Sequence, residues 1–410
     1  MKYILIVGDG MADLPVDALG GKTPLEAVEA PGMARVAGGT LGRIRTCPES
    51  LPAGSDVAFL TLLGHDPVKC YRGRSPLEAA GEQVELKEDE VSFRMNLISI
   101  GGEYENGVMA SYNGDGIDGV DAFELVTDLI HDPEFAELMK QAKMTITPTD
   151  TFRHITVLKA DDEPFELTPP HDIAGRPIRE YLPKGQKAEL LRAIQKRAHE
   201  FLSKHPVNLR REKAGLLPAN GGWFWGAGRA TILEDFTEKY QKTGTAVSAV
   251  PLVRGIAWLS GLKAPRINGA TGALETNYEG KVEATIRALL SGDDFVLLHL
   301  EAPDDMSHLG SLEGKLESIK RLDERMVQPV MKALDEMGEE YRLMVMPDHY
   351  TLLSTCTHDG TPAPFAIYDS RIPGRPRPFT EVACADQPIL ESGDALMRLF
   401  LEEDDKEEET

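Results

Sequence analysis

The stretch YRLMVMPDH, residues 341–349, is an apolar run that ends abruptly in an aspartate and a histidine. Two other stretches have the same form: YILIVGDG at residues 3–10 and DFVLLHLEAPDD at residues 294–305. Short, continuous apolar runs are typical of strands that are buried on both faces of a parallel sheet. We therefore predict three such strands, each of which delivers a carboxylate to its carboxyl end.

Helical patterns lie between these predicted strands. The clearest are KVEATIRALLSG at residues 281–292 and GKLESIKRLDERMVQPVMKALDEMG at residues 314–338. A further strand is expected over residues 245–250, followed by a helix over residues 253–262. Strands that alternate with helices indicate βαβ units. The fold class that we predict is α/β, with a mostly parallel sheet flanked by helices.

The middle of the chain has a different pattern, typical of a small α+β domain. Strand-like segments around one expected helix near 121–142 cover residues 90–102, 107–116, 144–150 and 152–160. An amphipathic helix over residues 187–205 is expected to return to the core. We therefore expect a discontinuous core of residues 1–80 and 180–410. Residues 81–179 are expected to form an inserted α+β domain that caps the substrate.

Composition limits the partners of the chain. Its 410 residues are 41% hydrophobic and 27% charged, which suits a globular protein with a large core. The formal net charge of −23 disfavours nucleic acid and anionic membranes, which both require a basic surface. A small anionic substrate is compatible with this net charge, because a local cluster of arginines or metal ions can make the charge of a binding pocket positive. The oligomeric state is left open.

The location that we expect is the cytoplasm. No apolar run approaches transmembrane length, and the N-terminal MKYILIVGDG is too short an apolar run for a signal peptide. The four cysteines, at positions 47, 70, 356 and 384, lack CxxC spacing and are interpreted as reduced thiols. The final LEEDDKEEET, residues 401–410, is interpreted as a solvated tail.

A ligand site is predicted at the carboxyl ends of the three strands. The candidate ligands are three aspartates and three nearby histidines: Asp9, Asp304, Asp348, His308, His349 and His358. A single acid at a strand end is often only a helix cap, but three acids and three histidines at one edge favour a bound ligand. His308 follows Asp304 at the i,i+4 spacing that places both on one helix face.

Three carboxylates and three imidazoles are enough ligands for two divalent cations. Such mixed ligands suit manganese or zinc, and magnesium or cobalt are also compatible. Two ions held close together form the usual clamp for phosphoryl transfer. The sequence therefore predicts a dinuclear metal site with phosphoryl-transfer chemistry.

Such a site needs a nucleophile, and LPAGSDVAFLTLLGHDP, residues 51–67, offers Ser55. Val57, Leu60 and Leu63 recur at helical spacing, so Ser55 is expected at a helix N-terminus, where free N–H groups favour an anion. A metal would lower the pKa of the Ser55 hydroxyl and so activate it. The alternative is that Ser55 is a plain helix cap.

Seven motifs, in chain order, carry a resemblance to a known family. They are VGDG (7–10), GSDVAFLTLLGHDP (54–67), GRSPLEAAG (73–81), PANGGWFWGAGR (218–229), NGATGALETNYEGK (268–281), EAPDDMSH (301–308), and PDHY with THDG (347–350 and 357–360). Together they resemble the archaeal-type cofactor-independent phosphoglycerate mutases, which belong to the alkaline phosphatase superfamily. The resemblance covers nearly the whole chain.

The resemblance implies an isomerase of glycolysis and gluconeogenesis that interconverts 3-phosphoglycerate and 2-phosphoglycerate without 2,3-bisphosphoglycerate. Ser55 would be the residue that is phosphorylated during turnover. One metal would be held by Asp9, Ser55, Asp348 and His349, and the other by Asp304, His308 and His358.

Arginines are the expected substrate ligands. Arg229, in GAGRA, resembles the phosphate-binding arginine of the family, and a guanidinium fork suits phosphate. Arg254 occupies a position where relatives often carry lysine, so its geometry differs from theirs. Arg74 and Arg94 are further candidates, with an ordinary surface arginine as the alternative for each.

Other function classes are also compatible with these residues. A homoserine kinase-like enzyme would use the same metal site, although the chain has neither a G-x-x-x-x-G-K-[ST] loop nor a kinase glycine loop. A phosphatase or phosphonate hydrolase would release phosphate faster than it isomerises the substrate. A non-catalytic metal-dependent binding protein would form no phosphoserine.

Overall fold

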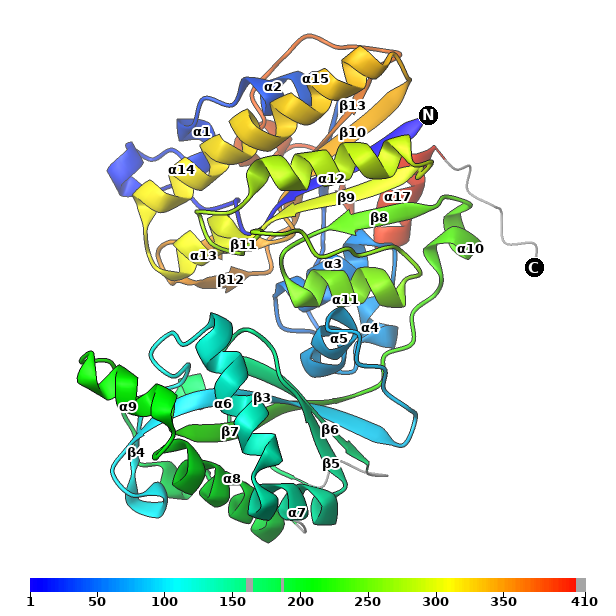
Figure 1. Ribbon diagram of the computed structural model, residues 1–410. Coiled ribbons are helices and arrows are strands. Elements are labelled where there is room, and N and C mark those ends of the chain that lie inside the picture. The colour runs from blue at the N-terminus through cyan, green and yellow to red at the C-terminus, as the bar shows by residue number, and fades with distance from the viewer. Residues whose placement is uncertain (160–164, 186–187, 403–410) are drawn as a thin grey trace. The chain divides into compact units, whose positions relative to one another are not determined.

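The computed structural model describes residues 1–159, 165–185 and 188–402. The chain divides into two compact units (Figure 1). The first unit comprises Met1–Tyr71, Ala80–Glu82 and Ile232–Thr410, and the second comprises Arg72–Ala79 and Gln83–Thr231. Residues 403–410, which include most of the expected acidic tail, lie outside the described residues. No helix in the described ranges is long and apolar enough to cross a membrane.

The first unit is built on a seven-stranded sheet in the order β14-β2-β13-β10-β1-β9-β8. The strands are β1 (Lys2–Gly8), β2 (Thr40–Ile44), β8 (Gly244–Val247), β9 (Phe295–Leu300), β10 (Tyr341–Met346), β13 (Ala363–Asp369) and β14 (Ile389–Leu390). β1 pairs in parallel with β9 and β10, and β8 pairs in parallel with β9. β13 runs antiparallel between β10 and β2. The predicted α/β class with a mostly parallel sheet is confirmed.

Helices cover both faces of this sheet. The helices of the first unit are α1 (Pro24–Ala27), α2 (Pro31–Val36), α3 (Ser55–Leu62), α4 (Pro67–Cys70), α10 (Phe236–Tyr240), α11 (Pro251–Leu259), α12 (Tyr278–Leu290), α13 (Ala302–His308), α14 (Leu312–Leu322), α15 (Gln328–Met337), α16 (Glu381–Cys384) and α17 (Gly393–Leu401). A further helix, α5 (Arg74–Gly81), runs from the second unit into the first.

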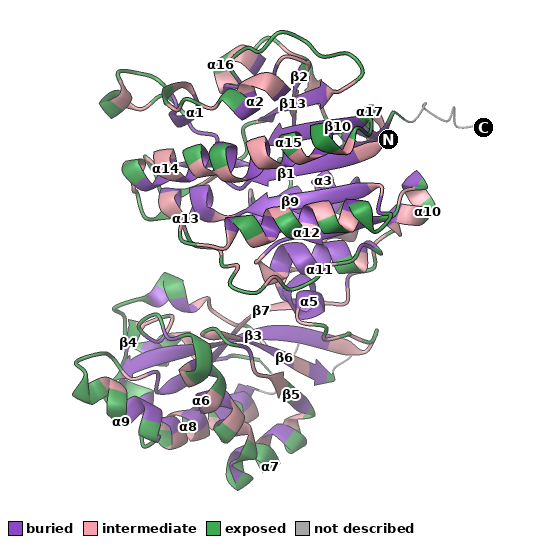
Figure 2. Cartoon of the chain, turned by 45° about the horizontal axis from the view of Figure 1, so that its top comes forward, coloured by how far each residue is buried: buried purple, intermediate pink, exposed green. Residues whose placement is uncertain are grey.

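The alternation of side chains along β1 assigns each face its helices. Ile4 and Ile6 belong to the core that also contains α12, α14 and α15 side chains, and Figure 2 shows α12 and α15 across this face of the sheet. Tyr3 points to the opposite face, where its ring packs edge-on against Phe400 of α17 at 5.8 Å between centroids. Both faces of the central strands are thereby buried, as their continuous apolar runs predicted.

The helix expected over residues 314–338 is interrupted by a π-helical turn at Asp323–Val327 between α14 and α15. Asp323 is fully buried, and its carboxylate accepts hydrogen bonds from the N–H groups of Gly32 (3.1 Å) and Met33 (2.6 Å) at the start of α2. Pro329 lies in the first turn of α15 and has no N–H to donate to the preceding turn. The wider π-helical turn therefore lets the helical run continue past Pro329 while the Asp323 carboxylate points into the core.

A substitution at Gly64, just after α3, tests how closely the first unit is packed. The φ of Gly64 is +83°, and a Cβ there would lie 1.9 Å from the Tyr240 hydroxyl oxygen. We expect Gly64→Ala to lower the free energy of unfolding by at least about 2 kcal/mol. The cost of the strained backbone and the cost of the clash with Tyr240 add to each other. Gly21→Ala is the matched control: its φ is +81° and its added Cβ meets nothing within 4 Å. Urea denaturation should show a loss of only about 1 kcal/mol for this control, and equal losses would refute the packing argument.

The second unit contains a five-stranded antiparallel sheet centred on β3. Its strands are β3 (Glu90–Gly101), β4 (Val108–Ser111), β5 (Met144–Thr147), β6 (Arg153–Lys159) and β7 (Gly221–Arg229), and its further helices are α6 (Gly119–His131), α7 (Pro133–Ala142), α8 (Ala188–Leu202) and α9 (Pro206–Lys213). β3 pairs with β6 along one edge and with β7 along the other. The expected α+β character of this unit matches these elements.

The boundaries of the second unit differ from those expected. It extends to Thr231, rather than ending at residue 179, and it begins at Arg72 rather than at residue 81. Residues of α8, among them Leu191 and Ile194, share one apolar core with β3, so this helix does not return to the first unit. The glycine-rich segment before Arg229 forms β7, whose pairing with β3 adds a strand that the local sequence did not indicate.

The helix expected near residues 121–142 is two helices, α6 and α7. Pro133 begins α7, since it cannot continue the hydrogen-bond ladder of α6. The Asp132 carboxylate caps α7 by accepting a hydrogen bond from the Phe135 N–H at 2.9 Å. The Asp-Pro pair therefore ends one helix and starts the next.

Candidate functional site

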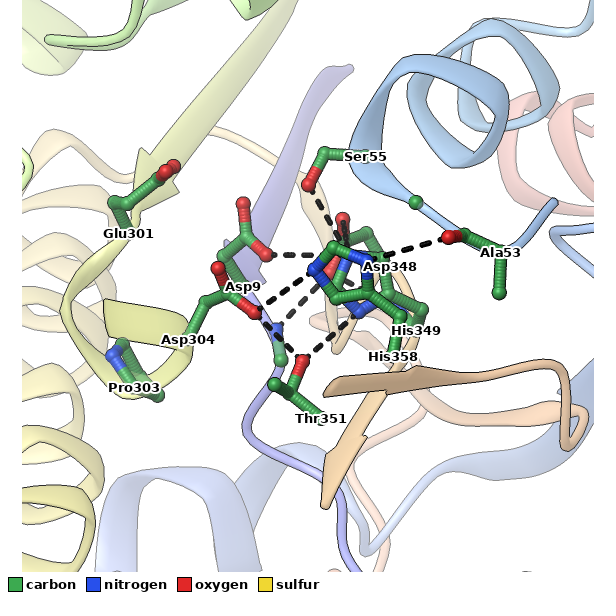
Figure 3. A network of polar contacts seen from close by, with 12 residues as sticks. Asp9, Ala53, Ser55, Glu301, Pro303, Asp304, Asp348, His349, Thr351 and His358 are labelled. Carbon is green, nitrogen blue, oxygen red and sulfur yellow. Dashed lines mark hydrogen bonds and ion pairs between the residues drawn. The ribbon is translucent and has the colours of Figure 1, made fainter. Parts of the chain in front are cut away.

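Three buried aspartates meet at the carboxyl edge of the first unit's sheet (Figure 3). Asp9 follows β1, Asp304 lies in the first turn of α13 after β9, and Asp348 follows β10. Asp9 and Asp348 are fully buried and Asp304 is 5% exposed. Because β1, β9 and β10 are parallel neighbours, their ends open at one edge, where ligands bind in such sheets.

Ser55 lies at the same place, as the first residue of α3. The N-cap residue is Gly54, and no side chain caps this helix, so Ser55 is not the plain cap that was the alternative. Its Oγ lies 3.1 Å from His349 Nε2. The N–H groups at the start of a helix favour an anion beside Ser55, although the Val57 N–H already donates to Asp56 Oδ1 at 3.0 Å.

The other nitrogen of His349 fixes the tautomer of the ring. Its Nδ1 lies 3.1 Å from the Oγ1 of Thr351, whose hydroxyl hydrogen is already donated to Asp304 Oδ1 at 2.6 Å. Thr351 therefore accepts the Nδ1 hydrogen of His349. The lone pair of His349 Nε2 is left to face Ser55.

Two carboxylate oxygens face the same lone pair. His349 Nε2 lies 3.1 Å from Asp348 Oδ2 and 3.6 Å from Asp9 Oδ1. Within the part of the chain that the structure describes, neither oxygen has a hydrogen-bond partner. We name Asp9, Ser55, Asp348 and His349 the Asp9 cluster; it is a set of converging acceptors, which a cation would satisfy.

A second group, the Asp304 cluster, consists of Asp304, His308 and His358. The Nδ1 atoms of the two histidines face the backbone carbonyls of Cys356 (2.8 Å) and Ala53 (3.2 Å). Carbonyls only accept hydrogen bonds, so both Nδ1 atoms carry hydrogens. The two Nε2 atoms lie 3.0 Å apart, and they lie 3.2 Å (His308) and 3.5 Å (His358) from the Asp304 carboxylate.

The two clusters differ in how their negative charge is compensated. Burial, followed by the charge of Asp348, raises the pKa of Asp9 well above its usual range. Burial also raises the pKa of Asp304, but hydrogen bonds from His308 and His358 outweigh it and hold that pKa well below its usual range. The same bond to Asp304 raises the pKa of His308 to about 9.

A divalent cation fits these donors. Ligand atoms of Asp9, Asp348 and His349 lie within 4.8 Å of one another, and so do those of Asp304, His349 and His358. Carboxylates and imidazoles are the usual ligands of divalent transition metals. His349 contributes to both groups, whereas the resemblance assigned it to the Asp9 cluster alone. The residues present are therefore compatible with divalent metal ions.

Two buried side chains that contact the candidate ligands were not predicted from the sequence. His299, in β9, points its Nε2 at Asp9 Oδ2 (2.9 Å) and its Nδ1 at the Ser248 hydroxyl (2.9 Å). A polar residue inside the apolar run FVLLHL was the signal for His299. Thr351, which bonds Asp304 and His349, had no comparable signal, because threonine is ordinary in a strand.

Two predicted substrate arginines lie in an ion-pair network of the second unit. Arg94 forms a bidentate pair with Glu78 (2.6 and 2.7 Å), which Arg74 contacts at 3.0 Å. Arg153, which was not predicted, contacts the same carboxylate at 3.5 Å. Arg94 is 4% exposed and its guanidinium lies 4.5 Å from the Trp225 ring centroid. Arg94 is therefore not an ordinary surface arginine.

The other two predicted arginines are placed differently. Arg229 ends β7 in the second unit and is half-buried. Arg254, in α11 of the first unit, is buried and donates to the Gly81 carbonyl (3.2 Å) and the Glu82 carboxylate (3.0 Å). These contacts hold the segment Ala80–Glu82, so Arg254 has a structural role in addition to any role in binding.

Sequence comparisons give the same family over nearly the whole chain. Residues 37–208 match the family model described as 2,3-bisphosphoglycerate-independent phosphoglycerate mutase. A protein of that name from Methanosarcina barkeri is 43% identical over 370 residues, which are 90% of each chain. A probable member from Geobacter sulfurreducens is 41% identical over 406 residues, 98% of this chain and 100% of the relative.

Solved structures share the fold. A protein of Pyrococcus horikoshii is 29% identical, with a TM-score of 0.75, and covers 99% of this chain and 98% of its own. The cofactor-independent phosphoglycerate mutase of Thermoplasma acidophilum, at 24% identity, has a TM-score of 0.61 over 98% of this chain and 99% of its own. With relatives above 40% identity along almost its full length, the chain belongs to the family of 2,3-bisphosphoglycerate-independent phosphoglycerate mutases.

Proposed function

We propose that this chain interconverts 3-phosphoglycerate and 2-phosphoglycerate without 2,3-bisphosphoglycerate, through a phosphoserine at Ser55. The observation that carries the proposal is the contact between the Ser55 hydroxyl and His349, which lies beside a carboxylate oxygen without a hydrogen-bond partner in the part of the chain that the structure describes. His349 Nε2 lies 3.1 Å from Ser55 Oγ, and the adjacent Asp348 Oδ2 has no hydrogen-bond donor among the described residues. A hydroxyl in such a setting is placed for activation as a nucleophile.

Two divalent ions, manganese first among the candidates, would be held by the two clusters. The Asp9 cluster would hold one ion, and the Asp304 cluster the other. When bound, the ions supply two effects: they lower the pKa of the Ser55 hydroxyl, and they offset negative charge on the transferred phosphoryl group. The fully buried carboxylates of Asp9 and Asp348 support this assignment, because two such charges need compensation.

The group transfer balances without a second substrate. Ser55 Oγ forms a bond to phosphorus, the bond from phosphorus to the 3-oxygen of glycerate breaks, and the Ser55 proton ends on that oxygen. In the return step the 2-hydroxyl of glycerate attacks the phosphoserine and its proton ends on Ser55. The N–H groups at the start of α3 would stabilise the phosphoryl oxygens in both steps.

We infer that the second unit acts as a capping domain. It carries Arg74, Arg94 and Arg229, which suit the carboxylate and phosphate of the substrate. The first unit carries the metal ligands and the nucleophile. Exclusion of water by such a cap would protect the phosphoserine from hydrolysis. As an enzyme of glycolysis, the protein would act in the cytoplasm.

Removal of metal is expected to abolish turnover. Chelated protein should show no activity on 3-phosphoglycerate in an enolase-coupled assay without 2,3-bisphosphoglycerate, and added Mn²⁺ should restore it. A parallel reaction with homoserine and ATP tests the kinase alternative. Phosphorylation of homoserine without mutase turnover would show that homoserine, not phosphoglycerate, is the substrate. Release of phosphate that is faster than isomerisation would indicate a phosphatase. Turnover that survives complete chelation would contradict the metal-centred mechanism.

A further inference from the structure

We propose that Thr351 is a positioning residue that joins the Asp9 cluster to the Asp304 cluster through its hydroxyl group. The inference rests on the proposed function, because it concerns the same metal centre. It adds a residue that neither the motifs nor the comparisons assign. In Figure 3, Thr351 lies beside Asp304 and His349, with dashed contacts to both.

The Thr351 hydroxyl contacts one member of each cluster. It donates to Asp304 Oδ1 at 2.6 Å, a distance typical of a charge-assisted bond, and it lies 3.1 Å from His349 Nδ1. Thr351 is fully buried, so water does not compete for these bonds. It also lies opposite His358 in the hairpin formed by β11 (Tyr350–Leu352) and β12 (Thr357–Asp359).

The hydroxyl decides which nitrogen of His349 can bind a metal. Its single hydrogen goes to Asp304, so it can only accept from His349, which requires the hydrogen of that ring to be on Nδ1. The Nε2 lone pair is then available on the side of Ser55 and Asp348. Partners of this kind orient ligands and set their tautomers at metal sites.

A buried lysine fixes the backbone of Thr351. Lys315, in α14, is fully buried and donates from Nζ to three oxygens: the Thr351 carbonyl (2.7 Å), the Asp13 carboxylate (2.8 Å) and the Ala12 carbonyl (3.2 Å). An ammonium group has three hydrogens, so all of them are used. The Thr351 N–H also donates to the Ala12 carbonyl at 3.3 Å. The loop after β1 and the strand β11 are thus tied together.

Close packing limits the rotamer of Thr351. A Cβ built on Gly10 would lie 2.4 Å from Thr351 Oγ1 and 2.7 Å from Asp304 Oδ1. Gly10 has a φ of +58°, and its N–H donates to Asp348 Oδ1 at 3.1 Å. The hydroxyl therefore occupies a space that is bounded by the backbone carrying Asp9, and it has little room to rotate away.

The test compares three variants of the full-length protein. Thr351→Val removes the hydroxyl and keeps the shape, and Thr351→Ser keeps the hydroxyl. Thr357→Val is the matched control, because Thr357 is an exposed residue of the same hairpin whose side chain faces away from that of His358. Urea denaturation verifies that each variant is folded. The readouts are Mn²⁺ affinity, measured by competition with a chelator, and the visible absorption spectrum with Co²⁺.

We expect Thr351→Val to bind Mn²⁺ about 10- to 100-fold more weakly than the wild type and to change the Co²⁺ spectrum. Thr351→Ser and Thr357→Val should match the wild type. Wild-type affinity and spectrum in Thr351→Val, or equal losses in Thr351→Ser, would overturn the inference and leave the proposed function intact. A wild type that binds neither ion would overturn both.

Discussion

Ser55→Ala is expected to lower kcat for the conversion of 3-phosphoglycerate by at least about 10⁴-fold, the scale of loss when a catalytic nucleophile is removed. The structure gives the reason. Ser55 Oγ lies 3.1 Å from His349 Nε2 at the start of α3, and alanine has no atom that can carry the phosphoryl group. Substrate binding by the arginines would remain, so kcat should change far more than KM.

The enolase-coupled assay measures this loss, and mass spectrometry of protein quenched during turnover measures the phosphoserine. Phosphorylated peptide from residues around position 55 should be present in the wild type and absent in Ser55→Ala. Ser203→Ala is the matched control: Ser203 lies in the second unit, and its hydroxyl has no hydrogen-bond partner among the described residues. The control should retain the wild-type rate. If the Ser55→Ala protein were still phosphorylated during turnover, the nucleophile would be a residue other than Ser55.

The sheet of the first unit could be predicted because each of its central strands is buried on both faces. Such a strand is apolar at most positions, and β1, β9 and β10 each appear in the sequence as a nearly continuous apolar run, with His299 as the polar exception inside β9. The β7 strand could not be predicted in this way. Four of its nine residues are glycines, whose local preference is for turns, and only pairing with β3 makes the segment a strand.

The meeting of Asp9, Asp304 and Asp348 at one edge of the sheet was predictable for a geometric reason. An acid within a few residues of the end of a buried strand lies at the carboxyl edge of the sheet, and parallel neighbours bring such acids together. No such rule predicts the residues that contact these aspartates and the histidines of the site. Thr351 reaches Asp304 only through tertiary structure, and Lys315 has the sequence pattern of a polar helix residue although it is fully buried.

The sequence also could not assign partners to the arginines. Arg74 and Glu78 are four residues apart, which predicts a helical pair, and this pair forms. Arg94 and Arg153 are distant in sequence and join the same carboxylate because β3 and β6 are neighbours. A cluster of this kind depends on strand pairing, which composition and spacing do not reveal.

Glu78→Gln is expected to lower the free energy of unfolding by about 3–5 kcal/mol, the cost of breaking a buried ion pair from one side. Glu78 is 4% exposed, and three guanidinium groups share its carboxylate. Glutamine keeps the shape but offers one neutral oxygen to three cations. Two of the three tryptophans, Trp223 and Trp225, lie in β7, so tryptophan fluorescence in urea reports mainly on this unit. Glu105→Gln is the control, since its pair with Lys196 is exposed (3.7 Å) and should cost at most about 1 kcal/mol.

The pH dependence separates this charge effect from a loss of packing. Burial raises the pKa of Glu78, but Arg94, Arg153 and Arg74 outweigh it and lower that pKa from its ordinary value of 4.5 to about 2. A carboxyl with a lower pKa in the folded chain binds its proton more readily when unfolded. Its stabilisation is therefore complete above pH 4.5 and is lost as the pH falls toward 2. The stability difference between wild type and Glu78→Gln should be constant near neutral pH and should narrow between these two values. A difference that stayed constant across this window would mean that glutamine disturbs packing, and that the three arginines do not depend on the charge of Glu78.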